Sequence, residues 1–103
     1  MIYIFGAAFD PPHVGHTAII RALLHYKNPT KIVLMPSGVR DDKSYNVSDE
    51  HRMKMLEIFQ REIDDVRIVV DDHFIKNWTG EMITKDVDLY ARENYGEDII
   101  HVF

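Results

Sequence analysis

Four short apolar runs alternate with longer amphipathic segments along this chain, and this alternation restricts the fold more than any other feature. The apolar runs have the composition of buried strands and span residues 2–6, 31–35, 66–70 and 99–103. Segments with apolar residues at helical spacing lie between them, at about 13–27, 48–63 and 79–95. Strands that alternate strictly with helices are usually parallel and joined by right-handed crossovers. The pattern therefore predicts an α/β fold with a doubly wound parallel sheet.

The ends of the expected helices carry residues that commonly start or stop helices. Asn28-Pro29 ends the first helix, because proline restricts the residue before it to extended backbone. Ser48 and Thr79 suit the N-cap positions of the second and third helices. Gly96 suits the position just after the third helix, where a left-handed backbone is common.

Chain length and composition predict one domain over residues 1–103. The 46% hydrophobic content is sufficient for a packed core, and the absence of cysteine excludes disulfides and thiolate metal sites. No apolar run approaches the roughly 20 residues that span a bilayer, and Met1–Phe5 lacks the basic flank of a secretory signal. We therefore expect a cytoplasmic protein with no membrane partner.

The net charge of −5 argues against a general nucleic-acid binder, because such proteins usually present a basic face to the phosphate backbone. An acidic protein can still bind a small polyphosphate where a helix N-terminus and a few local cations supply positive potential. The charge is therefore compatible with a small phosphorylated ligand and not with nucleic acid.

A candidate phosphate site follows the first strand, where Gly6 leads into a loop and then into a helix. His13 and His16 are three residues apart in the first turn, so their imidazoles point to the same side. Gly15 between them leaves room for a phosphate to approach the backbone. The helix start itself attracts anions through its N–H groups and dipole. This combination predicts an anion site at the carboxyl edge of the sheet.

The two histidines allow two other interpretations. Each histidine alone would be an ordinary residue at a helix start, and only their conjunction with Asp10, Pro11 and Pro12 favours a site. A zinc site is disfavoured, because the chain has no HExxH string, no cysteine and no third ligand at recognisable spacing. We expect no metal site formed by the protein alone.

The segment Gly6–His16 resembles the signature of the HxGH nucleotidyltransferase superfamily, and its Asp-Pro-Pro form most resembles bacterial nicotinate-mononucleotide adenylyltransferases. Weaker matches to that pattern are Pro36, Ser48, Arg52, Met55-Leu56 and Trp78-Thr79. The resemblance covers nearly the whole chain, although only the first motif is highly specific. It implies a Rossmann-like sheet of the nucleotidyltransferase type.

The resemblance also implies an activity, namely adenylyl transfer from ATP to a mononucleotide in NAD biosynthesis, with release of pyrophosphate. Mg²⁺ would accompany ATP and bridge its phosphate oxygens. By this likeness His13 and His16 would be catalytic, with His16 the stronger candidate for stabilising the transition state. The ATP-binding residues implied are Gly6, Ala7, Ala8, Phe9, His13, Gly15 and His16.

On the acceptor side, the resemblance implies substrate binding by Lys43, Arg52, Trp78 and Thr79. Trp78 would stack on the pyridine ring, although a core or hinge position is an equal alternative. Arg40 is a further cation in the loop after the second strand, which lacks the Pro-Pro pair common in the family. For Asp71-Asp72-His73 we favour a solvated turn at a strand end over a metal site.

The family pattern continues beyond Phe103 with an Ile-Gly-Ala-Asp-like segment and an Ile-Ser-Ser-Thr-x-x-Arg motif, so we interpret the chain as an N-terminal portion, incomplete at its C-terminus. Such a sheet lacks part of its cover, and we expect exposed apolar surface and self-association into a homo-oligomer. Whether the short chain is active on its own is left open by the sequence.

Two alternatives to the nicotinate-mononucleotide enzyme stay open. A sister enzyme with the same chemistry, such as a pantetheine-phosphate adenylyltransferase or a cytidylyltransferase, is disfavoured by Pro11 and Pro12. A non-catalytic nucleotide-binding module that kept only the phosphate loop is the second. The sequence does not choose between nicotinate and nicotinamide mononucleotide as acceptor.

Overall fold

The computed structural model describes residues 1–7, 9, 14–36, 49–77 and 84–102. The strands are β1 (Ile2–Ala7), β2 (Lys31–Pro36), β3 (Ile68–Val70) and β4 (Ile99–Val102). The helices are α1 (Val14–Tyr26), α2 (Asp49–Ile63), α3 (His73–Asn77) and α4 (Thr84–Tyr95).

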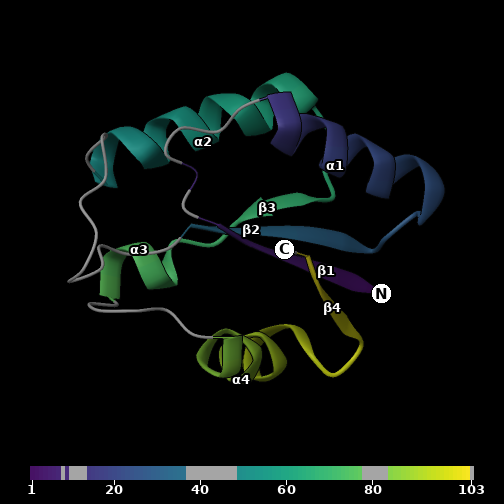
Figure 1. The fold of residues 1–103 in the computed structure, drawn as a ribbon, viewed down its shortest axis with the longest axis vertical. Coiled ribbons are helices and arrows are strands. Elements are labelled where there is room, and N and C mark those ends of the chain that lie inside the picture. The colour runs from purple at the N-terminus through teal and green to yellow at the C-terminus, as the bar shows by residue number, and fades with distance from the viewer. Residues whose placement is uncertain (8, 10–13, 37–48, 78–83, 103) are drawn as a thin grey trace.

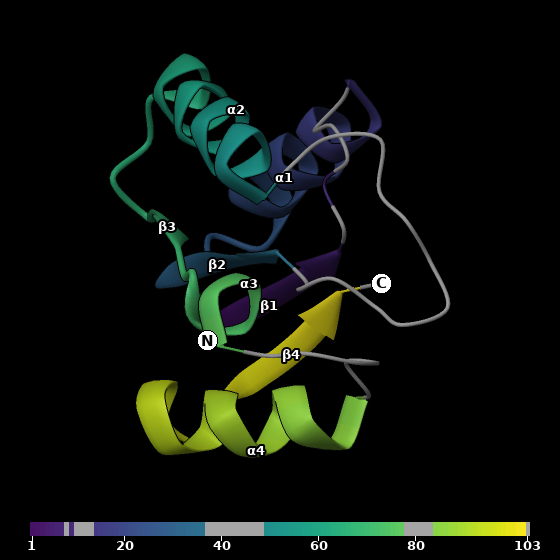
Figure 2. The same ribbon diagram turned by 90° about the vertical axis from the view of Figure 1, so that its left-hand side faces the viewer.

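The four described strands form one parallel sheet in the order β3-β2-β1-β4. Helices α1 and α2 cover one face of this sheet, and α3 and α4 lie on the opposite face (Figures 1 and 2). The sheet is therefore doubly wound, which confirms the fold predicted from the alternation of strands and helices. Because all pairs are parallel, the carboxyl ends of the strands meet at one edge.

The two central strands are buried on both faces, which explains their uninterrupted apolar sequences. Along β1, Tyr3 and Phe5 pack with α1 and α2, whereas Ile4 packs with α3 and α4. Along β2, Leu34 and Met35 divide between the two faces in the same way and are fully buried. Burial on both faces favours the β-branched and large apolar residues that these runs contain.

Strand β3 is shorter than the predicted segment 66–70, and a turn at its start is the reason. Val66 is fully exposed. The Asp65 side chain accepts a hydrogen bond from the backbone N–H of Arg67 at 2.9 Å, and the Asp65 carbonyl accepts one from Ile68 at 3.1 Å. The turn occupies the backbone through Arg67, so pairing with β2 begins at Ile68.

The short helix α3 was not predicted, because five residues are too few for a helical period to appear in the sequence. The predicted caps Ser48 and Thr79 lie outside the described residues. Gly96 follows α4 with a φ of +91°, and its N–H bonds to the carbonyl of Arg92 at 3.1 Å. The prediction of a helix-terminating glycine is confirmed. None of the helices described here is long and apolar enough to cross a membrane.

Candidate active site

The strand order places a topological switch point between β1 and β4. From β1 the chain passes through α1 to β2 on one side, whereas β4 lies on the other side of β1 and is reached through α4. In open α/β sheets, ligands bind in the crevice outside the carboxyl ends of the strands at this reversal. The residues at these ends are Ala7 on β1 and Val102 on β4.

The first turn of α1 lies beside this switch point, because α1 follows β1 directly. Gly15 and His16 belong to that turn and are partly buried. The start of a helix carries the positive end of the helix dipole, which favours a bound anion. An imidazole at this position can add a proton donor and, when protonated, a positive charge.

The ring of His16 packs against two aromatic rings of the core. The ring centroids of His16 and Phe9 are 4.8 Å apart, and those of His16 and Phe5 are 5.7 Å apart with nearly perpendicular planes. Phe5 and Phe9 also contact each other at 5.4 Å. The imidazole is therefore oriented by the protein interior, as a group that must meet a phosphate in a fixed geometry requires.

Phe9 has a left-handed backbone, with a φ of +49°, and its side chain is fully buried. A bulky residue with a positive φ is strained, typically by about 1–3 kcal/mol, and keeps this conformation only when its surroundings enforce it. Packing against Phe5 and His16 provides that constraint. The loop after β1 thus stores backbone strain beside the candidate phosphate site.

Of the predicted ATP-site residues, the structure describes the subset formed by Gly6, Ala7, Phe9, Gly15 and His16. It brings them together around the end of β1 and the start of α1. The other predicted residues, which are Ala8, His13, Lys43, Trp78 and Thr79, lie outside the described residues, as does Arg40. Their roles stay predictions.

Arg52, predicted to bind the acceptor, lies near the start of α2 and is 0% exposed. Among the residues whose side-chain burial is described, Arg52 is the one buried charged residue. A charged guanidinium is tolerated inside a protein only with compensating polar groups around it. The substrate role of Arg52 stays a prediction.

The end of β3 contains a polar cluster that the sequence analysis did not identify. The Asp71 carboxylate accepts hydrogen bonds from the hydroxyls of Tyr90 at 2.9 and 3.1 Å and Tyr95 at 2.5 Å. It also accepts one from the backbone N–H of His73 at 3.0 Å. Asp71, Asp72 and His73 are all partly buried, and His73 opens α3. The expectation of a solvated strand-end turn is met at Asp72, whose side chain is 43% exposed, and not at Asp71, which caps α3 and accepts hydrogen bonds from two tyrosines.

Both tyrosines of this cluster remain protonated over the ordinary pH range. Burial, followed by the hydrogen bond to Asp71, raises the pKa of Tyr90 to about 12. The same two causes, in the same order, raise the pKa of Tyr95 above its usual value. The hydroxyls therefore act as stable donors to the Asp71 carboxylate.

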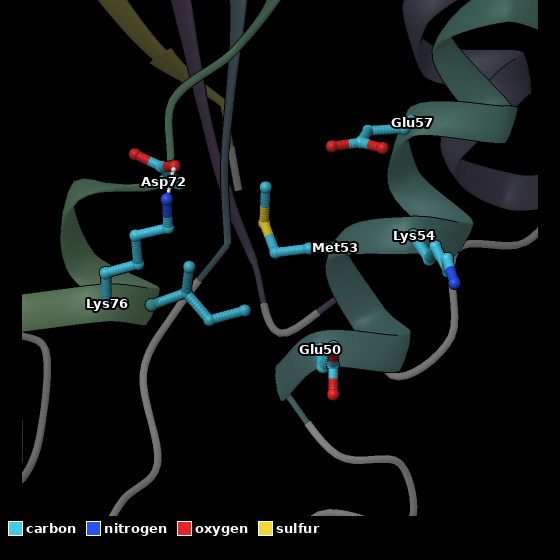
Figure 3. Close-up of a pocket in the computed structure, with 7 residues that line it drawn as sticks. Glu50, Met53, Lys54, Glu57, Asp72 and Lys76 are labelled. Carbon is cyan, nitrogen blue, oxygen red and sulfur yellow. Dashed lines mark ion pairs between the residues drawn. The ribbon is translucent and has the colours of Figure 1, made fainter.

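A cavity of about 400 Å³ lies between α2 and α3, with Met53, Glu57 and Lys76 among its walls (Figure 3). The Lys76 ammonium lies 2.7 Å from the Asp72 carboxylate. This pairing, together with Glu57, raises the pKa of Lys76, which keeps the amine charged. The cavity adjoins the end of β3, whereas the switch point lies beyond β2 at β1 and β4. None of the lining residues that the structure describes belongs to the candidate phosphate site.

A second ionic network joins α4 to β4. The Nε2 atom of His101 and the Oδ1 atom of Asp88 are 2.8 Å apart, and Arg92 pairs with the other Asp88 oxygen at 2.9 Å. These hydrogen bonds, that of His101 first, hold the pKa of Asp88 below its usual value. Within the described segments, no three His, Cys, Asp or Glu side chains are grouped as metal ligands would be.

Comparison with known proteins gives a consistent set of likenesses. A family model described as Cytidylyltransferase-like matches residues 4–101. A protein of Sulfurimonas denitrificans named "Probable nicotinate-nucleotide adenylyltransferase" is 43% identical over 74 residues, covering 70% of this chain and 39% of its own. A protein of Fusobacterium nucleatum with the same name is 29% identical over 105 residues, covering 96% and 53%. The chain thus spans about half the length, or less, of these relatives.

Among solved structures, the fold is similar to that of the Plasmodium falciparum nicotinic acid mononucleotide adenylyltransferase complexed with NaAD. The TM-score is 0.74 at 20% sequence identity, and the match covers 97% of this chain and 48% of that one. At this identity the likeness concerns the fold, and it agrees with the Rossmann-like sheet predicted from the sequence.

Proposed function

The chain belongs to the cytidylyltransferase-like family, whose model matches residues 4–101, and we propose that it transfers the adenylyl group of ATP to nicotinate mononucleotide. The products are a dinucleotide and pyrophosphate, so the reaction is a step of NAD biosynthesis. Nicotinamide mononucleotide is the alternative acceptor.

One observation carries the proposal more than any other, namely the position of His16. Its imidazole lies in the first turn of α1, beside the end of β1, and is held by the rings of Phe5 and Phe9. An oriented imidazole at a helix start suits the phosphates of a nucleotide. The names of the relatives supply the acceptor and the group transferred.

The chemistry requires no protein nucleophile. A phosphate oxygen of the mononucleotide attacks the α-phosphorus of ATP in line, forming a new P–O bond. The bond from the α-phosphorus to the bridging oxygen breaks, and pyrophosphate leaves with that electron pair. Catalysis then consists of positioning and of neutralising negative charge on the phosphates. We assign the second task to His16 and, from the motif, to His13.

The remaining substrate contacts are extensions of the same proposal. ATP enters as its magnesium complex, with the ion held by phosphate oxygens. We assign the wall of the phosphate site to Gly6 and Ala7 at the end of β1, Phe9 in the following loop and Gly15 in the first turn of α1, and Ala8 joins them from the motif.

Acceptor binding falls to Lys43, Arg52, Trp78 and Thr79, as the family pattern implies. A cytoplasmic location fits the cysteine-free composition. The homo-oligomer expected from the sequence stays a prediction.

The decisive experiment incubates the chain with MgATP and nicotinate mononucleotide and measures pyrophosphate and dinucleotide. Parallel reactions contain nicotinamide mononucleotide or no acceptor. We expect both products to form in equal amounts only with an acceptor. If the chain binds ATP but forms no product with either acceptor, the result would instead favour a non-catalytic nucleotide-binding module and would overturn the proposal.

A further inference from the structure

A groove of about 360 Å³ lies between α3 and α4, on the sheet face opposite α1 and α2 (Figures 1 and 2). Phe74 forms part of its α3 side, and Leu89 and Tyr90 form the apolar part of its α4 side. Leu89 is 59% exposed. In the part of the chain that the structure describes, the groove therefore presents an open apolar centre.

Two carboxylates flank this apolar centre. Asp86 lies three residues before Leu89 and Glu93 four residues after it, so the three side chains lie on one side of α4. Whereas Asp88 pairs with Arg92, the side chains of Asp86 and Glu93 form no ion pair or hydrogen bond within the described residues. The described residues that line the groove include no lysine or arginine, so its wall is acidic.

The exposed side of α2 carries the opposite pattern. Ile58 is 51% exposed, and the exposed cations Lys54 and Arg61 lie four residues before it and three residues after it. Neither cation forms an ion pair within the described segments. Glu50 and Glu57 flank these residues on the side toward α3, where they line the cavity between the two helices. We call Lys54, Ile58 and Arg61 the basic stripe of α2.

The basic stripe matches the groove when the two helices are antiparallel. In each helix the apolar residue lies between two like charges, which are about 10 Å apart along the axis. In each helix it is also three residues from one charge and four from the other. Antiparallel packing then pairs Arg61 with Asp86, Ile58 with Leu89, and Lys54 with Glu93.

We propose that the groove between α3 and α4 of one copy of this chain binds the basic stripe of α2 of a second copy. Helices α2 and α4 lie on opposite faces of the sheet, so the contact is head-to-tail (Figure 1). Each copy offers its groove to one neighbour and its basic stripe to another. The proposal gives the expected homo-oligomer a specific contact and does not depend on the proposed catalytic function.

Sedimentation velocity tests the contact. One helix in one groove should bury less than the roughly 1,000 Å² of a stable interface, so we expect a dissociation constant of about 10⁻⁴ M. The sedimentation coefficient of the wild type should rise across that concentration. Leu89→Ser and Ile58→Ser each remove one apolar centre and should sediment as monomers, whereas Val66→Ser, at a fully exposed residue outside both surfaces, should behave as the wild type. Thermal unfolding verifies that the variants are folded. A wild type that stays monomeric, or association of the Leu89 or Ile58 variant at the wild-type level, would overturn the proposal.

Mixing the two monomeric variants tests the head-to-tail arrangement. Ile58→Ser keeps an intact groove and Leu89→Ser keeps an intact basic stripe, so an equimolar mixture contains one functional contact. We expect the mixture to form pairs and nothing larger. A mixture that sediments no faster than its separate components would contradict the contact between groove and stripe.

Charge reversal tests the assigned pairing. Glu93→Lys and Lys54→Glu each place like charges opposite one another and should each weaken association about fivefold, the scale of an exposed ion pair. Both changes in one chain should restore association, because every altered groove then meets a matching stripe. Lys27→Glu, which changes the net charge equally at an exposed residue just after α1, is the control for Lys54→Glu. A double variant that associates no better than the single variants would overturn the pairing of Lys54 with Glu93.

Discussion

The imidazole of His16 lies against the ring of Phe9, with 4.8 Å between the ring centroids. Phe9 is fully buried and has a φ of +49°, so a strained residue of the core holds the side chain assigned to the phosphates. The contact between Phe9 and His16 therefore links the packing of the core to the proposed phosphate site. Substitutions of His16 and of Phe9 should have different effects, because His16 is partly exposed and Phe9 is not.

Replacing His16 by alanine should abolish most of the activity but should lower the free energy of unfolding only slightly. Loss of one preorganised group that stabilises transition-state charge typically lowers kcat by about 10²–10³. His25→Ala is the control, because His25 lies in the last turn of the same helix and contacts the exposed Tyr26 edge-on. Steady-state kinetics of pyrophosphate release should show normal turnover for His25→Ala. Comparable rates for both variants would remove His16 from the mechanism.

Replacing Phe9 by alanine should instead destabilise the fold. Removing a buried phenylalanine ring usually costs about 3–5 kcal/mol, through lost burial and the cavity that remains. Alanine would also keep the unfavourable positive φ without the packing that enforces it. Urea unfolding should show this loss of free energy, whereas Tyr26→Ala, at a site 78% exposed, should change it little. Similar losses for both variants would contradict the anchoring role of Phe9.

The sheet and its two helical layers were predictable because buried positions give a regular pattern of apolar residues in the sequence. The central strands β1 and β2 are apolar apart from Lys31 at the start of β2, and α1, α2 and α4 repeat apolar residues at helical spacing. The start of β3 was not predictable from the pattern of apolar residues, because Val66 is apolar yet fully exposed. There the side chain of Asp65 closes a turn that overrides the strand preference of its neighbours.

The site was predictable where it depends on local sequence and not where it depends on distant contacts. His16 could be placed from the glycine loop and helix start. Asp71 could not be assigned, because its partners Tyr90 and Tyr95 are 19 and 24 residues away. The available signal was the pair of tyrosines on α4, because a tyrosine hydroxyl usually finds a hydrogen-bond partner when its ring is buried.

The ion pair of Asp65 and Arg67 should make stability depend on pH at the acidic end. Hydrogen bonds from Arg67 lower the pKa of Asp65 from 3.8 to about 2. A lowered folded-state pKa gives a contribution that is complete above the unfolded value and is lost as pH falls through the folded value. The loss should therefore occur between about pH 4 and pH 2.

Urea unfolding of the wild type and Asp65→Asn across this range tests the sign. We expect the wild type to be more stable at pH 5 and the difference to shrink steadily toward pH 2. Glu62→Gln, which removes an exposed carboxylate from the end of α2, controls for the change in net charge. A difference between wild type and Asp65→Asn that grows on acidification would contradict the assigned direction.

Replacing Gly96 by alanine should destabilise the end of α4 through the backbone alone. Gly96 has a φ of +91°, and a Cβ atom built there would meet nothing within 4 Å. The cost is therefore conformational and not steric, about 1–2 kcal/mol for an L-residue in a left-handed backbone. Asparagine tolerates this region better than alanine, so Gly96→Asn should lose less stability. Thermal unfolding of the two variants distinguishes the causes, because a hidden clash would make the larger asparagine the more harmful substitution.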